Sequence, residues 1–378
     1  MNILIELLKY NLNGKKINRI NDNIDFKKLF LLAKRHSLGT LFYDALKDDD
    51  RIPAPVKDEA KQHYLAQVSQ QISQDYYAEE LFQKLREKNI KYMPLKGYVL
   101  RKLYPSSELR TSCDVDIFYD KTRRKEVEQI LLAMDFKKEE EGCKNAAWIN
   151  GNVTIEMHHE LANENSAYFD YYRSVWERLL TKDGIEYTFK NEDFYIYFLV
   201  HAASHFSGGG FGVRTLLDIY VYNKSVVMDK VYLYKELEKI RLDVFCRQLE
   251  KITAACFENA DLDEEGEFLL DYIVGAGTYG NSENSTAISS LSEQNSVPKN
   301  RRKYLIKTIF PPFKIMKSKY PILKKVPILY PFMWVWRWFG VAFRRRERIK
   351  ATVRNTKNIS ESNLNRVQRI LEITQLPM

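Results

Sequence analysis

The sequence predicts an α/β (α+β) core with a mixed β-sheet, flanked by helical regions on its N-terminal and C-terminal sides. Apolar residues follow helical spacing before residue 90, show short runs of strand-like alternation between residues 91 and 158, and return to helical spacing from residue 191. An Asn-Gly pair between two apolar runs adds a β-hairpin to the middle stretch. A length of 378 residues, with 45% hydrophobic and 29% charged residues, suits a globular protein of two or three domains.

Residues 1–80 form the predicted N-terminal helical region. Between residues 61 and 88, apolar side chains recur at steps of three and four residues, which is the spacing of one buried helix face. These side chains are Leu65, Val68, Ile72 and Tyr76.

Residues 81–190 form the predicted core. Its expected elements, in order, are a strand at 91–95, a short helix at 98–104, a strand at 114–118, a helix around 127–134 and a hairpin at 148–158. The hairpin turn is assigned to Asn150 and Gly151, because two-residue hairpin loops favour Asn-Gly.

Three further regions complete the chain. Residues 191–275 read as a helical domain, and its first helix is apolar on nearly every side. Residues 276–298 are rich in Ser, Asn and Gly, which predicts a flexible linker. Residues 299–378 form a basic, aromatic C-terminal helical region.

Cysteine usage and motifs exclude several functional classes. The four cysteines include no C-x-x-C pair, which argues against a zinc ribbon or a thioredoxin-type site. The sequence contains no P-loop and no G-x-S-x-G hydrolase motif. No run of eighteen uncharged apolar residues or signal peptide is apparent. We therefore expect a cytoplasmic protein.

The positive charge is concentrated in one segment. Residues 299–350 carry 16 Lys and Arg against one acid, a net charge of +15, whereas the rest of the chain sums to −6. Aromatic residues stand beside these cations between residues 328 and 339. One interpretation is a segment that lies on an anionic membrane surface at the inner face of the membrane. Another is that the aromatics pack on the helical domain with the arginines in solvent. Nucleic-acid binding ranks third, because no known module is recognisable.

Acidic residues occupy matching positions on two of the predicted strands. Asp114 and Asp116 are two residues apart, so their side chains share one face of a strand. By the same parity Glu156 and His158 share a face of the second hairpin strand. If the two strands are neighbours, the three carboxylates converge and need a cation between them. Oxygen ligands without thiolates suit Mg²⁺ or Mn²⁺.

Cationic and flexible positions accompany these acids. Gly97 opens a helix after a strand, where backbone amides could approach a phosphate, and Lys96 and Arg110 could add positive charge beside it. Two bound ions could bridge a nucleotide's phosphates for in-line phosphoryl transfer.

The arrangement resembles the nucleotidyltransferase superfamily of the DNA polymerase β type. More specifically, it is similar to the bacterial family of uncharacterised nucleotidyltransferase-like proteins. The matching features are Leu95-Lys96-Gly97, Tyr104-Pro105, Arg110, Asp114-Val115-Asp116, Glu156-Met157-His158, His201, His205, Arg214, Asp218 and a proline- and tyrosine-containing run from Pro311 to Pro331. They span most of the chain.

The resemblance implies a nucleotidyltransferase-like fold and metal-dependent transfer of NMP from an NTP to a hydroxyl acceptor, with release of pyrophosphate. It assigns the catalytic carboxylates Asp114 and Asp116 as metal ligands. It makes Glu156 the third catalytic carboxylate, which either ligates metal or takes the proton from the acceptor hydroxyl, and it places Gly97 against the triphosphate. The chain departs from the superfamily by lacking a hydroxyl residue after Gly97. This departure motivates an alternative, a non-catalytic nucleotide-binding or membrane-recruited adaptor. A further alternative is a toxin-like enzyme that modifies tRNA or protein.

Three histidines and one ion pair complete the candidates. His158 either supports the acids, contacts substrate or is simply a polar strand end. His201 and His205 are four residues apart on one predicted helix, and we expect them to be buried or to face substrate. Arg214 and Asp218 have the same spacing, which predicts an ion pair within the helix, with a substrate role for Arg214 as the alternative.

Overall fold

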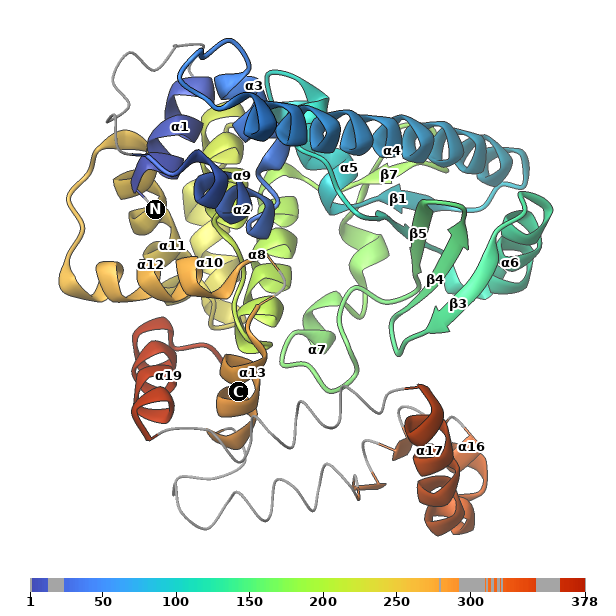
Figure 1. Ribbon diagram of the computed structural model, residues 1–378. Coiled ribbons are helices and arrows are strands. Elements are labelled where there is room, and N and C mark those ends of the chain that lie inside the picture. Colours follow the sequence, from blue (N-terminus) through green and yellow to red (C-terminus); the bar gives the residue numbers. More distant parts are fainter. Residues whose placement is uncertain are drawn as a thin grey trace.

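The computed structural model describes residues 2–12, 24–278, 280–291, 361–377 and, apart from 311, 314–315, 318–319 and 321, residues 310–344. These residues form a mixed α/β fold in which a five-stranded sheet lies beside a larger body of helices (Figure 1). The predicted fold class is confirmed.

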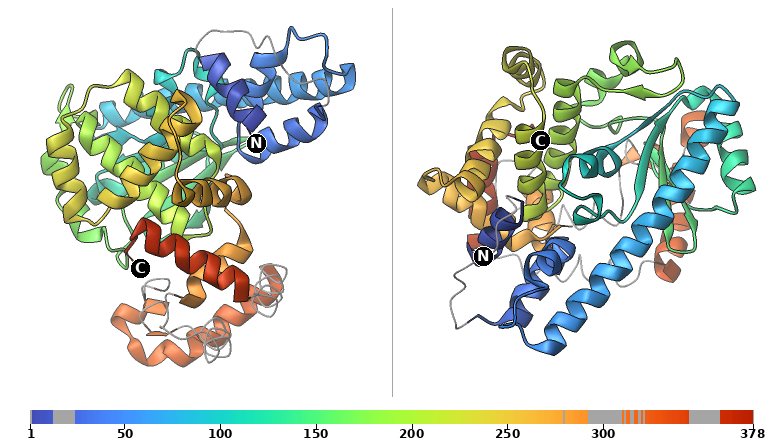
Figure 2. Two further views of the ribbon diagram at one scale, coloured as in Figure 1. Left: turned by 90° about the vertical axis from the view of Figure 1, so that its left-hand side faces the viewer. Right: turned by 90° about the horizontal axis from the view of Figure 1, so that it is seen from above.

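In the described part of the chain, four helices precede the sheet. They are α1 (Asn2–Leu12), α2 (Phe26–Arg35), α3 (Gly39–Leu46) and α4 (Ala54–Glu87). The 34-residue helix α4 passes without a break through the boundary predicted at residue 80. Its first half packs against α2 and α3, and its second half lies along the sheet (Figures 1 and 2).

The buried face of α4 is not the one that the apolar spacing predicted. Leu65, Ile72 and Tyr76 are 54%, 64% and 66% exposed. The inward positions in the middle of the helix are instead the polar residues Gln71 and Gln74, which are buried. The prediction was wrong because a buried polar face leaves no hydrophobic signal in the sequence.

The sheet has the strand order β1-β2-β5-β4-β3. Its strands are β1 (Tyr92–Pro94), β2 (Val115–Tyr119), β3 (Lys137–Glu141), β4 (Asn145–Asn150) and β5 (Val153–His158). β2 and β5 are parallel, and the other neighbouring pairs are antiparallel. The connections contain α5 (Lys96–Leu100), η1 (Arg101–Leu103), η2 (Ser107–Leu109), η3 (Lys121–Arg123) and α6 (Arg124–Ala133).

Alternation along the central strands separates a structural face from a functional face. Val115 and Ile117 of β2 belong to a buried cluster that includes apolar residues of α4 and α6. Asp116 and Phe118 have the opposite parity, and Phe118 belongs to the large core of the helical body. The side of the sheet that carries the acids therefore faces the helices that follow it.

The predicted hairpin is present with a shifted turn. Asn150 pairs with Val153, so the two loop residues are Gly151 and Asn152. Gly151 has a φ of +58°. Gly is favoured at the first position of a two-residue type II′ loop because it adopts a positive φ without a steric penalty. The pairing register, and not the Asn-Gly preference, decides the turn.

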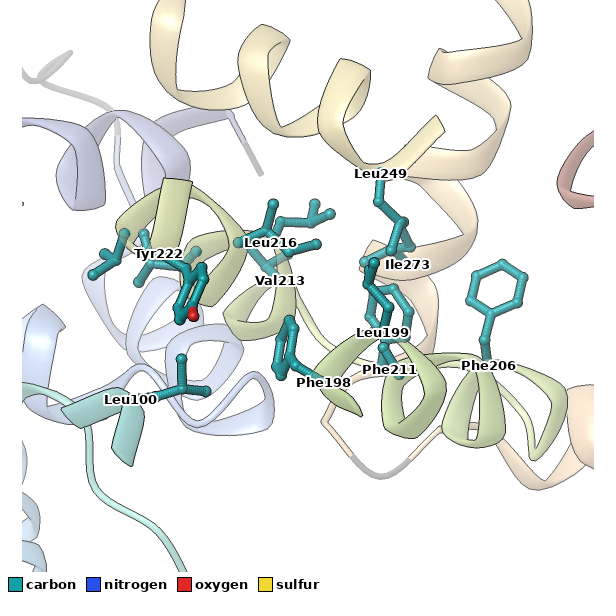
Figure 3. Packing of buried hydrophobic residues seen from close by; sticks show 14 of the residues in the cluster. Leu100, Phe198, Leu199, Phe206, Phe211, Val213, Leu216, Tyr222, Leu249 and Ile273 are labelled. Carbon is teal, nitrogen blue, oxygen red and sulfur yellow. The ribbon is translucent and has the colours of Figure 1, made fainter. Parts of the chain in front are cut away.

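The helical body follows the sheet. Between them lie α7 (Phe169–Tyr172), η4 (Val175–Arg178) and the short strands β6 (Leu180–Thr181) and β7 (Tyr187–Thr188). The body contains α8 (Asn191–Ser207), α9 (Val213–Ser225), α10 (Lys230–Lys239), α11 (Asp243–Glu258) and α12 (Glu264–Ala276). Phe198 of α8 and Leu100 of α5 approach each other at its border with the sheet (Figure 3).

The segment predicted as a flexible linker contains helix α13 (Ser282–Leu291). Buried Ala287 and Ile288 of α13 pack with Leu364 and Val367 of α19 (Glu361–Thr374). A distant partner thus stabilises a Ser-rich stretch whose composition favours a loop. Residues 292–298 of the predicted linker lie outside the described residues.

The rest of the C-terminal region contributes α16 (Ile322–Lys325), η5 (Pro327–Leu329) and α17 (Tyr330–Arg344). Among the described residues, no helix combines the length and apolarity needed to cross a membrane.

Candidate active site

The acids meet because β2 and β5 are parallel neighbours. Asp116 stands opposite Glu156 in the register, and Asp114 immediately precedes β2. All three carboxylates line a cavity of about 350 Å³ between the sheet and helices α8 and α9. Lys96, Gly97, Arg110, His205 and Arg214 line the same cavity. The structure therefore brings all the predicted site residues together, and His158, which does not line the cavity, is buried in contact with Asp116.

His158 is joined directly to the acids. Its Nε2 lies 2.6 Å from Asp116 Oδ1 and 3.4 Å from Glu156 Oε2. The Nδ1 atom is buried without a hydrogen-bond partner among the described residues. Because the ionised Asp116 carboxylate can only accept, the Nε2–H group of His158 donates a hydrogen bond to Asp116 and holds this carboxylate in place.

Lys96 is a second partner of Asp116. The Lys96 ammonium donates to Asp116 Oδ1 at 2.8 Å, and both side chains are largely buried. Burial favours the neutral form of Asp116, but Lys96 and His158 outweigh this and hold the pKa of Asp116 well below its usual range. Burial likewise opposes the charge on Lys96, yet Asp116 produces a net rise in the pKa of Lys96. The two groups form a charged pair inside the protein.

The backbone at Lys96 is unusual. Its φ is +36°, in the left-handed region that non-glycine residues seldom adopt. Such conformations persist where the surroundings hold them, often at functional sites. Here the ion pair with Asp116 holds the Lys96 side chain and so supports this backbone conformation.

Asp114 differs from Asp116 in its electrostatic surroundings. Burial, the neighbouring Asp116 charge and, to a lesser extent, Glu156 raise the pKa of Asp114 to about 6, despite the opposing effect of Lys96. Glu156 has a lowered pKa, chiefly because His158 stabilises its charge. Asp114 is thus the carboxylate closest to exchanging a proton near neutral pH.

The donor set fits a divalent cation. One ligand atom each from Asp116, Glu156 and His158 lies within 4.8 Å of the other two. Asp114 is outside this cluster but lines the same cavity. Carboxylate oxygens are ligands that suit hard cations such as Mg²⁺ and Mn²⁺.

Gly97 has a clear steric role. A Cβ at this position would lie 2.6 Å from Arg110 Nη1 and 3.2 Å from Ser112 Oγ. The absence of a side chain lets the Arg110 guanidinium and the segment before β2 approach helix α5.

Arg110 and Asp218 form the ion pair that the sequence assigned to Arg214 and Asp218. Nε and Nη2 of Arg110 donate to the two Asp218 oxygens at 3.1 and 3.0 Å, and Tyr104 Oη adds a third hydrogen bond at 2.8 Å. Arg214 instead donates to the Thr111 carbonyl at 3.0 Å. The prediction of an intrahelical pair was wrong because a bidentate partner from another segment competes for Asp218.

The wall opposite the acids carries a histidine pair. Nε2 of His201 and Nε2 of His205 are 2.9 Å apart on α8. Burial and the positive charge of Lys96 lower the pKa of both imidazoles, that of His205 to about 4. Both are therefore neutral at neutral pH, and one donates to the other.

Comparisons with known proteins agree with this geometry. The profile of a family described as uncharacterised nucleotidyltransferase matches residues 22–258, which is more than half of the chain. The chain belongs to this family. Comparisons with curated proteins and with solved structures give no significant match.

The match of the uncharacterised nucleotidyltransferase family covers the acids, the sheet and the helices that enclose the cavity. Several cavity residues escaped the sequence analysis, and Lys144 and Ser112 are the two that bear on the chemistry. Lys144 precedes β4 and lines the cavity, but no motif distinguishes it from other lysines. Ser112 places a hydroxyl beside Gly97 and donates to the Asp114 carbonyl at 3.0 Å. A hydroxyl is therefore present at the turn, although it comes from a segment fifteen positions later in the chain.

Proposed function

We propose that this protein transfers NMP from an NTP to a hydroxyl acceptor in a metal-dependent reaction that releases pyrophosphate. The observation that carries the proposal is the pairing of Asp116 with Glu156 on parallel strands, facing a cavity that also holds Lys96, Lys144 and Arg214. Acids for metal ions and cations for phosphates are the two components that phosphoryl transfer requires.

The proposed step forms one bond and breaks one. The acceptor oxygen bonds to the α-phosphorus, the bond from that phosphorus to the bridging α–β oxygen breaks, and pyrophosphate departs with the electron pair. The hydroxyl proton passes to a base. Asp114 suits this role because its pKa is raised to about 6, so it is mostly ionised at neutral pH yet basic enough to accept a proton.

Asp116 and Glu156 would hold the metal ion, with Asp114 beside them and His158 orienting Asp116. Bound Mg²⁺ or Mn²⁺ would supply electrostatic stabilisation of the charge that develops on the phosphate oxygens. Lys144, which precedes β4 on the sheet side, and Arg214 of α9 would bind the triphosphate. Arg110, held by Asp218, positions the turn at Gly97.

The experiment measures pyrophosphate release and transfer of label from each NTP in turn, radiolabelled at the α-phosphate, with cell lysate as the source of acceptors. We expect Mn²⁺- or Mg²⁺-dependent labelling that the variant Asp114→Asn/Asp116→Asn abolishes. Asp170→Asn is the matched control, because Asp170 is an exposed carboxylate outside the cavity. Unchanged turnover in a folded double variant, checked by circular dichroism, would refute the assignment.

A non-catalytic nucleotide-binding protein is the second candidate. It is supported by the Lys96 ammonium, which already neutralises Asp116 without a metal ion. This candidate predicts NTP binding by calorimetry with no pyrophosphate release at any metal concentration. We also propose a cytoplasmic location, supported by the low cysteine content of four in 378 residues, which is too sparse for a disulfide scaffold.

A further inference from the structure

Helix α17 exposes an apolar face that makes no part of the described core. Phe332 and Trp336 are each 71% exposed and Val335 is 49% exposed, while Ile328 in the preceding turn is 79% exposed. Their spacing of four, seven and eight residues from Ile328 places these side chains on one side of the helical segment. Large aromatic residues gathered on one exposed face are uncommon in a soluble domain and indicate a binding surface.

The opposite face of α17 is already packed. Tyr330 and Trp334 contact each other and meet Phe313 and Phe310, with ring centroids 5.2 and 5.1 Å apart. Met316 and Leu323 are buried in the same segment. Figures 1 and 2 show this unit at the end of the molecule opposite α4. The exposed face is thus the outer side of a unit that has its own small core.

The charge of the surrounding sequence identifies the chemistry of the partner. Residues 299–350 carry a net charge of +15. The partner must therefore offer dense negative charge together with an apolar phase for Trp336 and Phe332. An anionic lipid bilayer offers both, because headgroup phosphates lie directly above the acyl chains. A nucleic acid matches the charge, but its bases are mostly stacked and give no comparable apolar layer.

We infer that α17, with the basic sequence around it, forms a peripheral binding surface for an anionic lipid bilayer. The helix lies in the plane of the interface, with Ile328, Phe332, Val335 and Trp336 directed into the headgroup–acyl boundary. The net positive charge of the sequence 299–350 attracts the headgroup phosphates. This inference is independent of the proposed enzymatic activity.

The test is co-sedimentation of the full-length protein with large vesicles of phosphatidylcholine alone or mixed with phosphatidylglycerol. We expect binding to the anionic vesicles only, and we expect about 0.5 M salt to weaken it, because salt screens the attraction between charges. The variant Phe332→Gln/Trp336→Gln should weaken binding about tenfold or more, because two buried aromatic side chains are lost from the interface. Both positions are exposed, so the substitutions leave the fold intact.

The matched control is Ile72→Gln/Tyr76→Gln, which removes two equally exposed apolar side chains from α4. It should bind vesicles as the unmodified protein does. Three results would overturn the inference: no vesicle binding, equal binding to both vesicle types, or equal losses in the two double variants. RNA or duplex DNA binding of similar salt sensitivity without vesicle binding would instead assign the surface to nucleic acid.

Discussion

Lys96 occupies a position that a metal ion would share. Its ammonium lies 2.8 Å from Asp116 Oδ1, and Asp116 belongs to the group of side chains that could hold a cation. Metal binding therefore requires Lys96 to share or release Asp116. A triphosphate entering beside the cation is the natural new partner for the released ammonium.

Replacing this lysine tests the competition. Lys96→Met leaves Asp116 with His158 as its only described partner, and loss of a buried pair costs about 3–5 kcal/mol of folding free energy. We expect Mn²⁺ to raise the thermal midpoint more in Lys96→Met than in the unmodified protein. Lys144→Met is the control, since Lys144 lines the same cavity without a hydrogen bond to Asp116 among the described contacts. Equal Mn²⁺ shifts in all three proteins would contradict the competition.

His36 shows how a buried histidine links stability to pH. It lies between α2 and α9 and accepts a hydrogen bond from the Val213 amide through Nδ1 at 3.1 Å. Burial, reinforced by Arg35, lowers the pKa of His36 from 6.5 to about 4. The unfolded chain therefore binds more protons between these pH values, and the folded state loses stability as pH falls from 6.5 towards 4.

We expect this histidine to reduce the free energy of unfolding by about 2 kcal/mol between about pH 7 and about pH 5. His36→Asn keeps an acceptor near the Val213 amide but removes the titrating group, so the variant should lose less stability over the same interval. Urea unfolding at both pH values measures the difference. If the two proteins lose equal stability, His36 does not contribute to the pH dependence.

At the scale of elements, α4 connects the helical body to the active site. Ala78, Leu81, Phe82 and Leu85 pack against the sheet. One turn earlier, Gln74 Nε2 donates to the Ser112 carbonyl at 3.1 Å and so anchors the segment that leads into Asp114. The same helix thus supplies part of the core and a support for the site.

The corrected face of α4 can be tested with one pair of variants. Leu81 is fully buried, so Leu81→Ala should lower the free energy of unfolding by about 2–5 kcal/mol through lost contacts and a cavity. Leu65 is 54% exposed, so Leu65→Ala should change it by less than about 0.5 kcal/mol. Denaturant unfolding distinguishes the two. A larger loss of unfolding free energy in Leu65→Ala than in Leu81→Ala would show that the face predicted from the apolar spacing is the buried one.

At the scale of the molecule, the cluster of Arg110, Asp218 and Tyr104 joins the sheet to the helical body. Arg110 and Tyr104 belong to the connection between β1 and β2, whereas Asp218 belongs to α9. All three side chains are buried. The cluster therefore sets how the acids on the sheet face the cations and histidines of the opposite wall.

Asp218→Asn should cost about 3–5 kcal/mol of folding free energy, because it leaves the buried Arg110 charge without its counter-ion. Tyr104→Phe removes one hydrogen bond to a charged group and should cost about 1.5–3 kcal/mol. Glu258→Gln, in an exposed pair with Lys224, should cost less than about 1 kcal/mol. Urea titrations of the three variants provide the comparison. Similar losses of folding free energy in Asp218→Asn and Glu258→Gln would contradict the proposal that the buried pair joins the sheet to the helical body.

The sequence by itself determined the fold class, the strands that became β1, β2, β4 and β5, and the strand faces that carry the acids, but not strand β3 or the pairing of β2 with β5. These features depend on the alternation of side chains along a strand. Asp114, Asp116 and Glu156 were therefore predictable from strand parity and from one motif pattern. The hairpin was also predictable, although pairing moved its turn to Gly151 and Asn152.

Only the tertiary structure decided which distant groups become partners. Asp218 pairs with Arg110 and not with Arg214, Lys96 pairs with Asp116, and the predicted linker folds as α13 against α19. The tertiary structure also decided that α4 buries the polar residues Gln71 and Gln74 in its middle. The physical reason is that helix and strand periods are properties of neighbouring residues, whereas an ion pair or a packed face depends on which distant segments compete for the same position.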